Sequence, residues 1–295
     1  MFGQLLTAMV TPFDEELRLD LTRLPDLIDH LIDNGTTAIL VCGTTGEWPT
    51  LTEEERLALF EEAVRLCAGR VPVIAGVAGQ STEKTVAYLQ KVDALGVAGF
   101  SVVAPYYNKP SQEGVYRHFR AVADATSKPV LIYNIPSRTG VNITAETQIR
   151  LSHVDHIVGV KESSGDFTQI SRVIGDTTEE FYVYSGDDKY TLPLLALGAD
   201  GVVSVASHVV GLALRRMIEA FALGDHTVAQ RIHHRTFPLF EELFKTSNPV
   251  MVKAALEQLD IRVGGVRPPL VDATPAEKRE LRRVLAKVAE LPALH

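Results

Sequence analysis

The sequence predicts an α/β protein, a closed (β/α)8 (TIM) barrel with a C-terminal helical extension. Eight short apolar runs alternate with amphipathic helical segments along the chain up to about residue 224. The runs are continuously apolar rather than alternating, which is typical of parallel strands covered on both faces. From about Asp225 onward the strand rhythm stops, and only helical segments follow.

The expected strands lie at residues 5–10, 38–41, 71–77, 99–104, 129–134, 156–161, 181–186 and 200–205. Between them are recognisable helix signals. After the second run, Thr52 is a candidate N-cap, Glu55 its capping-box partner and Gly69 a stop. The main alternative is an open doubly wound sheet, which usually has a glycine-rich turn after its first strand. The segment "MVTPFDEE" after the first run contains no glycine, so the barrel is preferred.

The 295 residues would suit two average domains, but α/β barrels of this length often form one. We assign residues 1–224 to a catalytic barrel and residues 225–295 to a helical appendage packed on it. Its expected helices lie at residues 226–244, 248–259 and 274–291.

Composition and charge exclude several classes of function. The net charge is -8 and the pI is about 5.6, which disfavours a nucleic-acid or anionic-membrane partner. Cys42 and Cys67 are the only cysteines and form no C-x-x-C pair, so no disulfide scaffold is expected. No stretch approaches the ~18 apolar residues of a membrane span, and the N-terminus lacks the pattern of a signal peptide. We expect a cytoplasmic protein that acts on small molecules.

In a (β/α)8 barrel, chemistry collects at the carboxyl ends of the strands. Polar side chains follow six of the predicted strands, and each could separately be a solvated or capping residue. Their occurrence at one end of a barrel favours a functional site. They are Thr44 and Thr45, Tyr106 and Tyr107, Tyr133 and Arg138, Lys161, and Ser204 and Ser207, while Gly186 and Asp187 end the seventh strand.

Lys161 ends an apolar strand, where burying an ammonium is costly. A neutral lysine amine can attack a ketone and, after loss of water, form an imine that acts as an electron sink. Desolvation at an apolar strand end favours the neutral amine. A nearby phenol such as Tyr133 can shuttle protons during imine formation. We therefore expect Lys161 to be buried for its reactivity.

Other chemistries fit less well. A metal-dependent aldolase needs convergent histidine and carboxylate ligands, but only His208 follows a barrel strand, and we expect it to be solvated. Asp187 and Asp188 could suggest a cation site, although a solvated loop pair is the preferred interpretation. A pyridoxal-phosphate barrel would need a phosphate cradle that is not evident. No metal is expected.

Four segments in order resemble the motifs of the dihydrodipicolinate synthase family, within the pyruvate-dependent class I aldolase superfamily that also includes N-acetylneuraminate lyase. They are "GTTGE" (residues 43–47), "PYYNKP" (105–110), "YNIPSRTG" (133–140) and "GVKESSGD" (159–166). The resemblance extends from the first strand into the C-terminal helices. It implies condensation of pyruvate with L-aspartate 4-semialdehyde to 4-hydroxy-tetrahydrodipicolinate, in the diaminopimelate route to lysine, without a cofactor.

The resemblance also implies residue roles. Lys161 would form the imine with pyruvate, and Thr45 and its turn would hold the pyruvate carboxylate, helped by the helix that begins near Thr52. The family is typically a homotetramer, a dimer of dimers, in which Tyr107 reaches a neighbouring subunit's site. The implied proton relay is Tyr133, Thr44 and Tyr107, and backbone atoms near Gly186 and Val203 would line the pocket.

Arg138 favours the synthase within the superfamily. A second substrate with its own carboxylate calls for the two-pronged cation that arginine provides. Sugar-acid aldolases of the superfamily generally resemble "YNIPALSG", whereas this chain has "YNIPSRTG". Two alternatives remain: another pyruvate-dependent aldolase, of the 2-keto-3-deoxy sugar acid or N-acetylneuraminate type, and a non-catalytic ligand-binding barrel.

Lysine-inhibited members of the family grip free lysine in a cleft at the dimer interface, using acidic, His and Asn side chains. Two cations in the corresponding set here, Arg56 and Lys84, would repel the ammonium of lysine. We therefore predict weak or absent inhibition by lysine. The corresponding positions are Trp48, Glu53, Arg56, Gln80, Lys84 and Tyr106.

Overall fold

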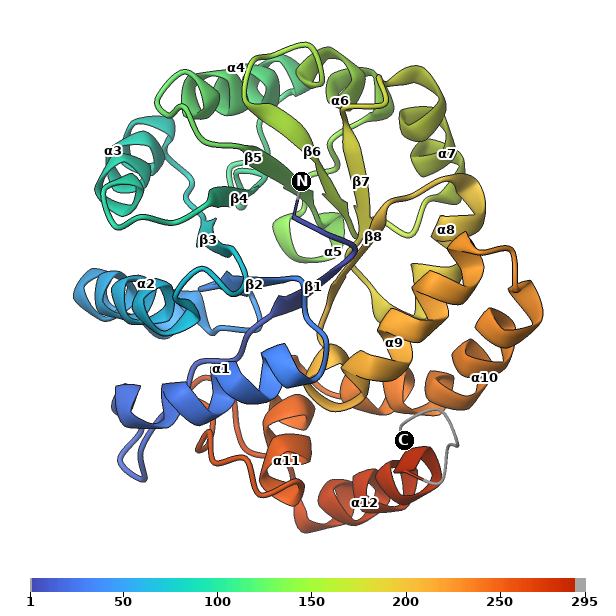
Figure 1. Ribbon diagram of the computed structural model, residues 1–295. Coiled ribbons are helices and arrows are strands. Elements are labelled where there is room, and N and C mark those ends of the chain that lie inside the picture. The colour runs from blue at the N-terminus through green and yellow to red at the C-terminus, as the bar shows by residue number, and fades with distance from the viewer. Residues whose placement is uncertain (1, 290–295) are drawn as a thin grey trace.

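The computed structural model describes residues 2–289 and confirms the predicted fold. Eight strands close into a barrel in sequence order, and each pairs with its neighbours in parallel (Figure 1). The strands are β1 (Leu5–Ala8), β2 (Ala38–Val41), β3 (Val73–Val77), β4 (Gly99–Val103), β5 (Val130–Asn134), β6 (Ile157–Glu162), β7 (Tyr182–Ser185) and β8 (Gly201–Ser204).

Helices surround the barrel (Figure 1). The first nine are α1 (Leu24–Asp33), α2 (Glu53–Cys67), α3 (Thr82–Asp93), α4 (Gln112–Ala123), α5 (Pro136–Thr139), α6 (Ala145–Leu151), α7 (Phe167–Asp176), α8 (Thr191–Leu197) and α9 (Ser207–Ala222). The expected capping box of α2 is present, because the Thr52 hydroxyl accepts from the Glu55 amide while the Glu55 carboxylate accepts from the Thr52 amide. The helix ends at Cys67, and Ala68 takes the left-handed cap conformation before Gly69.

The apolar core has two parts. The larger part lies between the barrel and the helices, and a smaller cluster fills the barrel interior. Inside the barrel, Leu6, Leu40 and Leu131 pack with Tyr184, whose hydroxyl donates to the carbonyl of Gly3 at 3.0 Å. Phe2 belongs to the same cluster, so the N-terminal segment closes one end of the barrel and leaves the other for a site.

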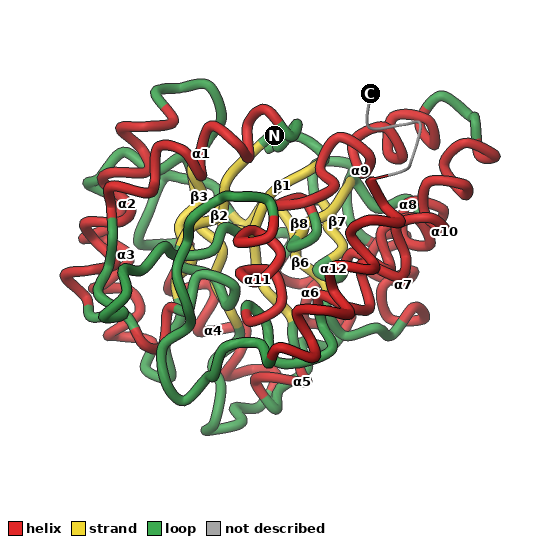
Figure 2. Tube along the Cα trace, turned by 90° about the horizontal axis from the view of Figure 1, so that it is seen from below, coloured by secondary structure: helices red, strands yellow, loops and turns green. Residues whose placement is uncertain are grey.

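The C-terminal segment contains the three expected helices, α10 (His226–Leu243), α11 (Val250–Gln258) and α12 (Pro275–Ala289). Positions 290 and 291 of the third expected helix lie outside the described residues. Helix α10 packs along α9, and α12 packs against both α10 and α11. Figures 1 and 2 place α11 and α12 together on one flank of the barrel. These contacts do not test whether a domain boundary lies at residue 224, so the division into residues 1–224 and 225–295 stays a prediction. None of the described helices has the length and apolar character to cross a membrane.

Candidate active site

Strand register brings Lys161 and Tyr133 together. Tyr133 of β5 is paired with Lys161 of β6, and paired residues of neighbouring parallel strands point to the same face of a sheet. Lys161 Nζ lies 4.3 Å from the centre of the Tyr133 ring. Lys161 is 6% exposed and Tyr133 is 8% exposed. The expected burial of Lys161 is therefore confirmed.

Gly186 lies next to the Lys161 side chain. A Cβ atom at Gly186 would come within 3.1 Å of Lys161 Cε, so a larger residue there would crowd the amine. Val203 of β8 is buried in the cluster inside the barrel, two strands from Lys161. Both predicted lining residues are thus on the interior side, although Val203 is part of the packed core.

Thr44 and Thr45 lie on a tight turn after β2. The amides of Gly46 and Glu47 donate to the carbonyls of Gly43 and Thr44, each at 3.1 Å. Thr44 is half-buried, whereas Thr45 is buried and its hydroxyl accepts from Asn248 Nδ2 at 2.9 Å. The turn therefore presents the two hydroxyls in different surroundings.

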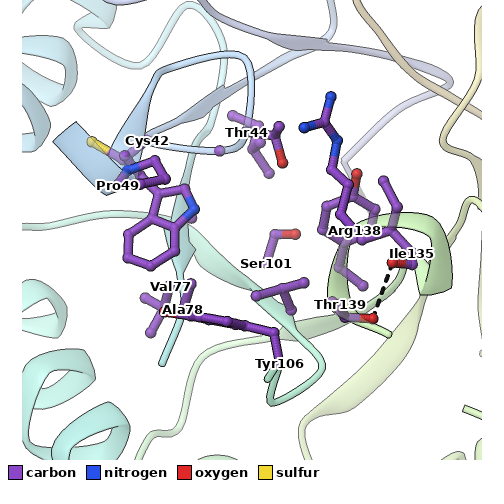
Figure 3. Close-up of a pocket in the computed structure, with 16 residues that line it drawn as sticks. Cys42, Thr44, Pro49, Val77, Ala78, Ser101, Tyr106, Ile135, Arg138 and Thr139 are labelled. Carbon is purple, nitrogen blue, oxygen red and sulfur yellow. Dashed lines mark hydrogen bonds between the residues drawn. The ribbon is translucent and has the colours of Figure 1, made fainter. Parts of the chain in front are cut away.

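A cavity of about 260 Å³ opens at this end of the barrel. Thr44, Tyr133 and Arg138 line it together with Trp48 and Tyr106. In Figure 3, Thr44 and Arg138 lie at one end of the pocket and Tyr106 at the other, with the Ser101 hydroxyl between them. The cavity presents a threonine hydroxyl, phenols and a guanidinium to a small molecule.

Arg138 lies on the single-turn helix α5. Thr139 Oγ1 donates to the carbonyl of Ile135 at 3.0 Å, and Gly140 ends the turn in the left-handed conformation. The Arg138 side chain is exposed at the cavity, and no carboxylate within residues 2–289 forms an ion pair with it. A cation in this position is available to a carboxylate ligand.

Tyr107 is not part of this cavity. It is 87% exposed and its backbone lies in the left-handed region, with φ of 70°. Its neighbour Tyr106 is half-buried and packs edge-on against Trp48, with ring centres 6.0 Å apart. Within one chain, the loop therefore turns Tyr106 toward the cavity and Tyr107 away from it.

The six candidate cleft residues form only a partial group. The Arg56 guanidinium lies 5.8 Å from the Trp48 ring centre and 4.8 Å from that of Tyr88, which was not predicted as a member. The Glu53 carboxylate pairs with Lys91 at 2.6 Å. Gln80 and Lys84 are exposed near the start of α3.

Two expectations about polar residues near the strand ends are wrong. His208 is fully buried, not solvated. Both ring nitrogens are satisfied inside the protein, because Val10 N donates to Nε2 at 3.2 Å and Nδ1 donates to the Val205 carbonyl at 2.8 Å. Burial lowers the pKa of His208 to about 4, so the ring is neutral.

Asp188 is likewise buried, and only Asp187 is half-buried. The Asp188 carboxylate accepts from the Ser204 hydroxyl and from the amides of Val205 and Ala206, at 3.0 and 2.9 Å for the amides. Burial raises the pKa of Asp188 to about 6, and these hydrogen bonds oppose the rise. Asp188 thus caps the turn after β8. Among the described residues, no three His, Cys, Asp or Glu side chains gather as a metal site would require.

Sequence reasoning missed the buried polar residues behind the site. Glu162 follows Lys161 and points to the opposite face of β6, where its carboxylate accepts from Asn134 Nδ2, Gln148 Nε2 and the Ser164 amide. Lys253 and Glu47 form a buried ion pair at 2.7 Å. Lys253 carried a usable signal, because it is a lysine within the apolar run "VMVKAAL", as Lys161 is in its strand.

A closed parallel barrel with a buried lysine beside Tyr133, which lines an open cavity together with Arg138, is typical of a (β/α)8-barrel enzyme. Lys161 itself is not among the described residues that line this cavity, and Tyr133 lies between the two. The model of the Dihydrodipicolinate synthetase family matches residues 1–288. The chain belongs to this family, which confirms the resemblance predicted from four motifs.

Named relatives agree over the full length. The chain is 50% identical to a 4-hydroxy-tetrahydrodipicolinate synthase of Desulforudis audaxviator, covering 98% of each protein, and 47% identical to that of Bacillus subtilis, covering 97% of this chain and 99% of the other. A structure of the Cyanidioschyzon merolae enzyme with lysine bound has a TM-score of 0.96 at 46% identity, covering 98% and 99%. The chloride-inhibited Acinetobacter baumannii enzyme complexed with pyruvate has a TM-score of 0.95 at 34% identity, covering 99% and 100%.

Proposed function

We propose that this protein condenses pyruvate with L-aspartate 4-semialdehyde to give 4-hydroxy-tetrahydrodipicolinate, as the names of its relatives indicate. The single observation that supports an imine mechanism is the buried Lys161 amine beside Tyr133 at the carboxyl end of β6. The amine attacks the ketone carbon of pyruvate, and loss of water gives the imine. Loss of a proton from the methyl carbon then gives an enamine, whose carbon attacks the aldehyde.

The proposed proton carriers are Tyr133 and Thr44, with Tyr107 supplied by a second subunit. A phenol and a hydroxyl can pass the protons that imine formation takes up and releases. Thr45 and the amides of its turn would hold the pyruvate carboxylate, and Arg138 the carboxylate of the semialdehyde. Thr44, Tyr133 and Arg138 line one cavity, which supports a shared substrate pocket.

The exposed position of Tyr107 supports an oligomer. The Tyr107 side chain is 87% exposed and its backbone is strained, so in an isolated chain it makes no contact with the other described residues that would offset the cost of that strain. The homotetramer and the donation of Tyr107 between subunits are therefore part of this proposal. One solved relative, at 38% identity with a TM-score of 0.95, is described as a monomeric variant, so assembly can differ within the family.

A coupled assay tests the proposed substrates. Turnover should occur with pyruvate and L-aspartate 4-semialdehyde, and should be at least about a hundredfold weaker with 2-keto-3-deoxy sugar acids or N-acetylneuraminate, whose polyol chains do not satisfy Arg138. Faster turnover of a sugar acid would assign the chain to another aldolase activity. No turnover with either class, together with tight binding of a keto acid, would favour the ligand-binding barrel.

A further inference from the structure

We propose that Lys253 of α11 is a positioning residue for the turn at residues 43–47, which it fixes through a buried pair with Glu47. The inference rests on the proposed function, which assigns the Thr44 and Thr45 hydroxyls of that turn to pyruvate. It gives the C-terminal helices a role in substrate binding, although they contribute no side chain to the cavity.

The ion pair is almost completely removed from solvent. Lys253 Nζ lies 2.7 Å from Glu47 Oε1, and the two side chains are 3% and 1% exposed. Lys253 Nζ also donates to the Gly265 carbonyl at 2.7 Å and lies 4.1 Å from the Phe13 ring centre. Desolvation of both charges offsets much of the attraction of such a pair. Stability alone is therefore a weak explanation for it, and a role in fixing geometry is a better one.

The Glu47 side chain needs contacts that fix it, because the backbone conformation of Glu47 is unfavourable. Its φ of 55° and ψ of 34° lie in the left-handed region, which is unfavourable for a residue with a Cβ. Both carboxylate oxygens are engaged by the C-terminal segment, since Oε1 contacts Lys253 and Oε2 accepts from the Arg267 amide at 2.9 Å. The side chain therefore fixes the end of the turn.

The same segment also holds the middle of the turn and the residues after it. Asn248 Nδ2 donates to Thr45 Oγ1, so the hydrogen of the Thr45 hydroxyl is left to donate elsewhere. The Arg267 guanidinium donates to the Thr50 carbonyl at 2.8 Å and pairs with both oxygens of Glu55. The turn is thus clamped from one side by residues 248–267.

Steady-state kinetics of the full chain separate positioning from simple stability. A displaced turn weakens the hold on pyruvate, while the semialdehyde is held by Arg138, which lies on a separate element, α5, that residues 248–267 do not hold in place. Glu47→Gln keeps the size of the side chain and removes the charge, and Lys253→Met removes the amine. In each variant we expect the KM for pyruvate to rise about tenfold and the KM for the semialdehyde to change less than about twofold.

Lys128→Met is a control for the loss of a lysine–carboxylate pair elsewhere, because Lys128 pairs with Asp93 at 2.6 Å between α3 and the start of β5 without contacting the turn. This pair is less buried, with side chains 27% and 25% exposed. Lys128→Met should lower stability and leave both KM values unchanged. If Lys253→Met does not fold, Glu47→Gln and the double variant, which leaves no unpaired buried charge, decide the question. An unchanged pyruvate KM in folded Glu47→Gln and in the double variant would overturn the role of Lys253. Absence of turnover in the wild-type protein would instead contradict the proposed function.

Discussion

The amine of Lys161 lies against the face of the Tyr133 ring, 4.3 Å from its centre, and the register of β5 and β6 pairs these two residues. Two neighbouring barrel strands therefore deliver an amine and a phenol to the same point. A small molecule bound there can touch both groups, which is the arrangement that imine formation needs. Arg138 and Thr44 lie at the adjoining cavity and can orient that molecule.

Arg138→Ala should separate binding of the two substrates. The variant loses the cation that faces the cavity, so we expect kcat/KM for L-aspartate 4-semialdehyde to fall about a hundredfold, while pyruvate imine formation is retained. Arg138→Lys should recover only part of the loss, because an ammonium cannot form the two-pronged pair. Steady-state kinetics and borohydride trapping measure the two effects. Wild-type activity in Arg138→Ala would show that Arg138 is a surface residue with no role.

Mixing two inactive variants tests whether Tyr107 acts between subunits. Tyr107→Phe and Lys161→Met should each have little activity alone. After unfolding and refolding together, hybrid dimers contain one site with an intact Lys161 and an intact Tyr107, so activity should recover to about a quarter of wild type if the two residues come from different subunits. Refolding each variant separately is the control. No recovery in hybrids shown to form would place both residues in one chain's site.

Lysine should inhibit this enzyme weakly. The candidate cleft presents Arg56 and Lys84, and the Glu53 carboxylate is already paired with Lys91. An incoming ammonium would meet like charges. An inhibition curve should show half-inhibition only above about 1 mM lysine. Replacing both cations, as Arg56→Gln with Lys84→Gln, should strengthen inhibition by lysine. Half-inhibition of the wild type by lysine below about 1 mM would contradict the predicted repulsion.

Asp188 should make stability depend on pH. Burial raises its pKa from 3.8 to about 6, so the folded protein binds this proton more tightly than the unfolded chain does. The stabilisation is fully present below about pH 4 and is lost as pH rises to about 6, by ~3 kcal/mol in total. Asp188→Asn removes the titration and keeps an acceptor for Val205 and Ala206. Urea unfolding should therefore show the wild type losing stability relative to the variant between pH 5 and pH 8, by on the order of 1 kcal/mol. A difference that is independent of pH, or that grows in favour of the wild type, would contradict this.

The fold was predictable because apolar runs and capping residues are local signals. The spacing of Thr52 and Glu55 alone predicts the start of α2. Continuous apolar runs indicate strands of a sheet covered on both faces. The burial of Lys161 was predictable for the same reason, since a lysine at the end of an apolar run is unusual.

The buried polar residues could not be predicted from local pattern. The sequence pattern predicts that Asp188 and His208 are solvated, but both are buried in the folded barrel. Their side chains accept hydrogen bonds from backbone amides that come close to them only on folding. The partner of Glu47 is equally remote, because Lys253 arrives from α11. Pairings between distant segments decide the surroundings of such residues, and the order of residues along the chain does not encode them locally.

The most direct test of the mechanism is borohydride reduction in the presence of pyruvate, followed by peptide mass analysis, with Lys161→Met as the control. The proposed mechanism predicts a reduced pyruvate adduct on Lys161 that requires pyruvate, with loss of turnover in proportion to labelling, and neither adduct nor turnover in the variant. An adduct on another lysine, or wild-type turnover in Lys161→Met, would contradict it.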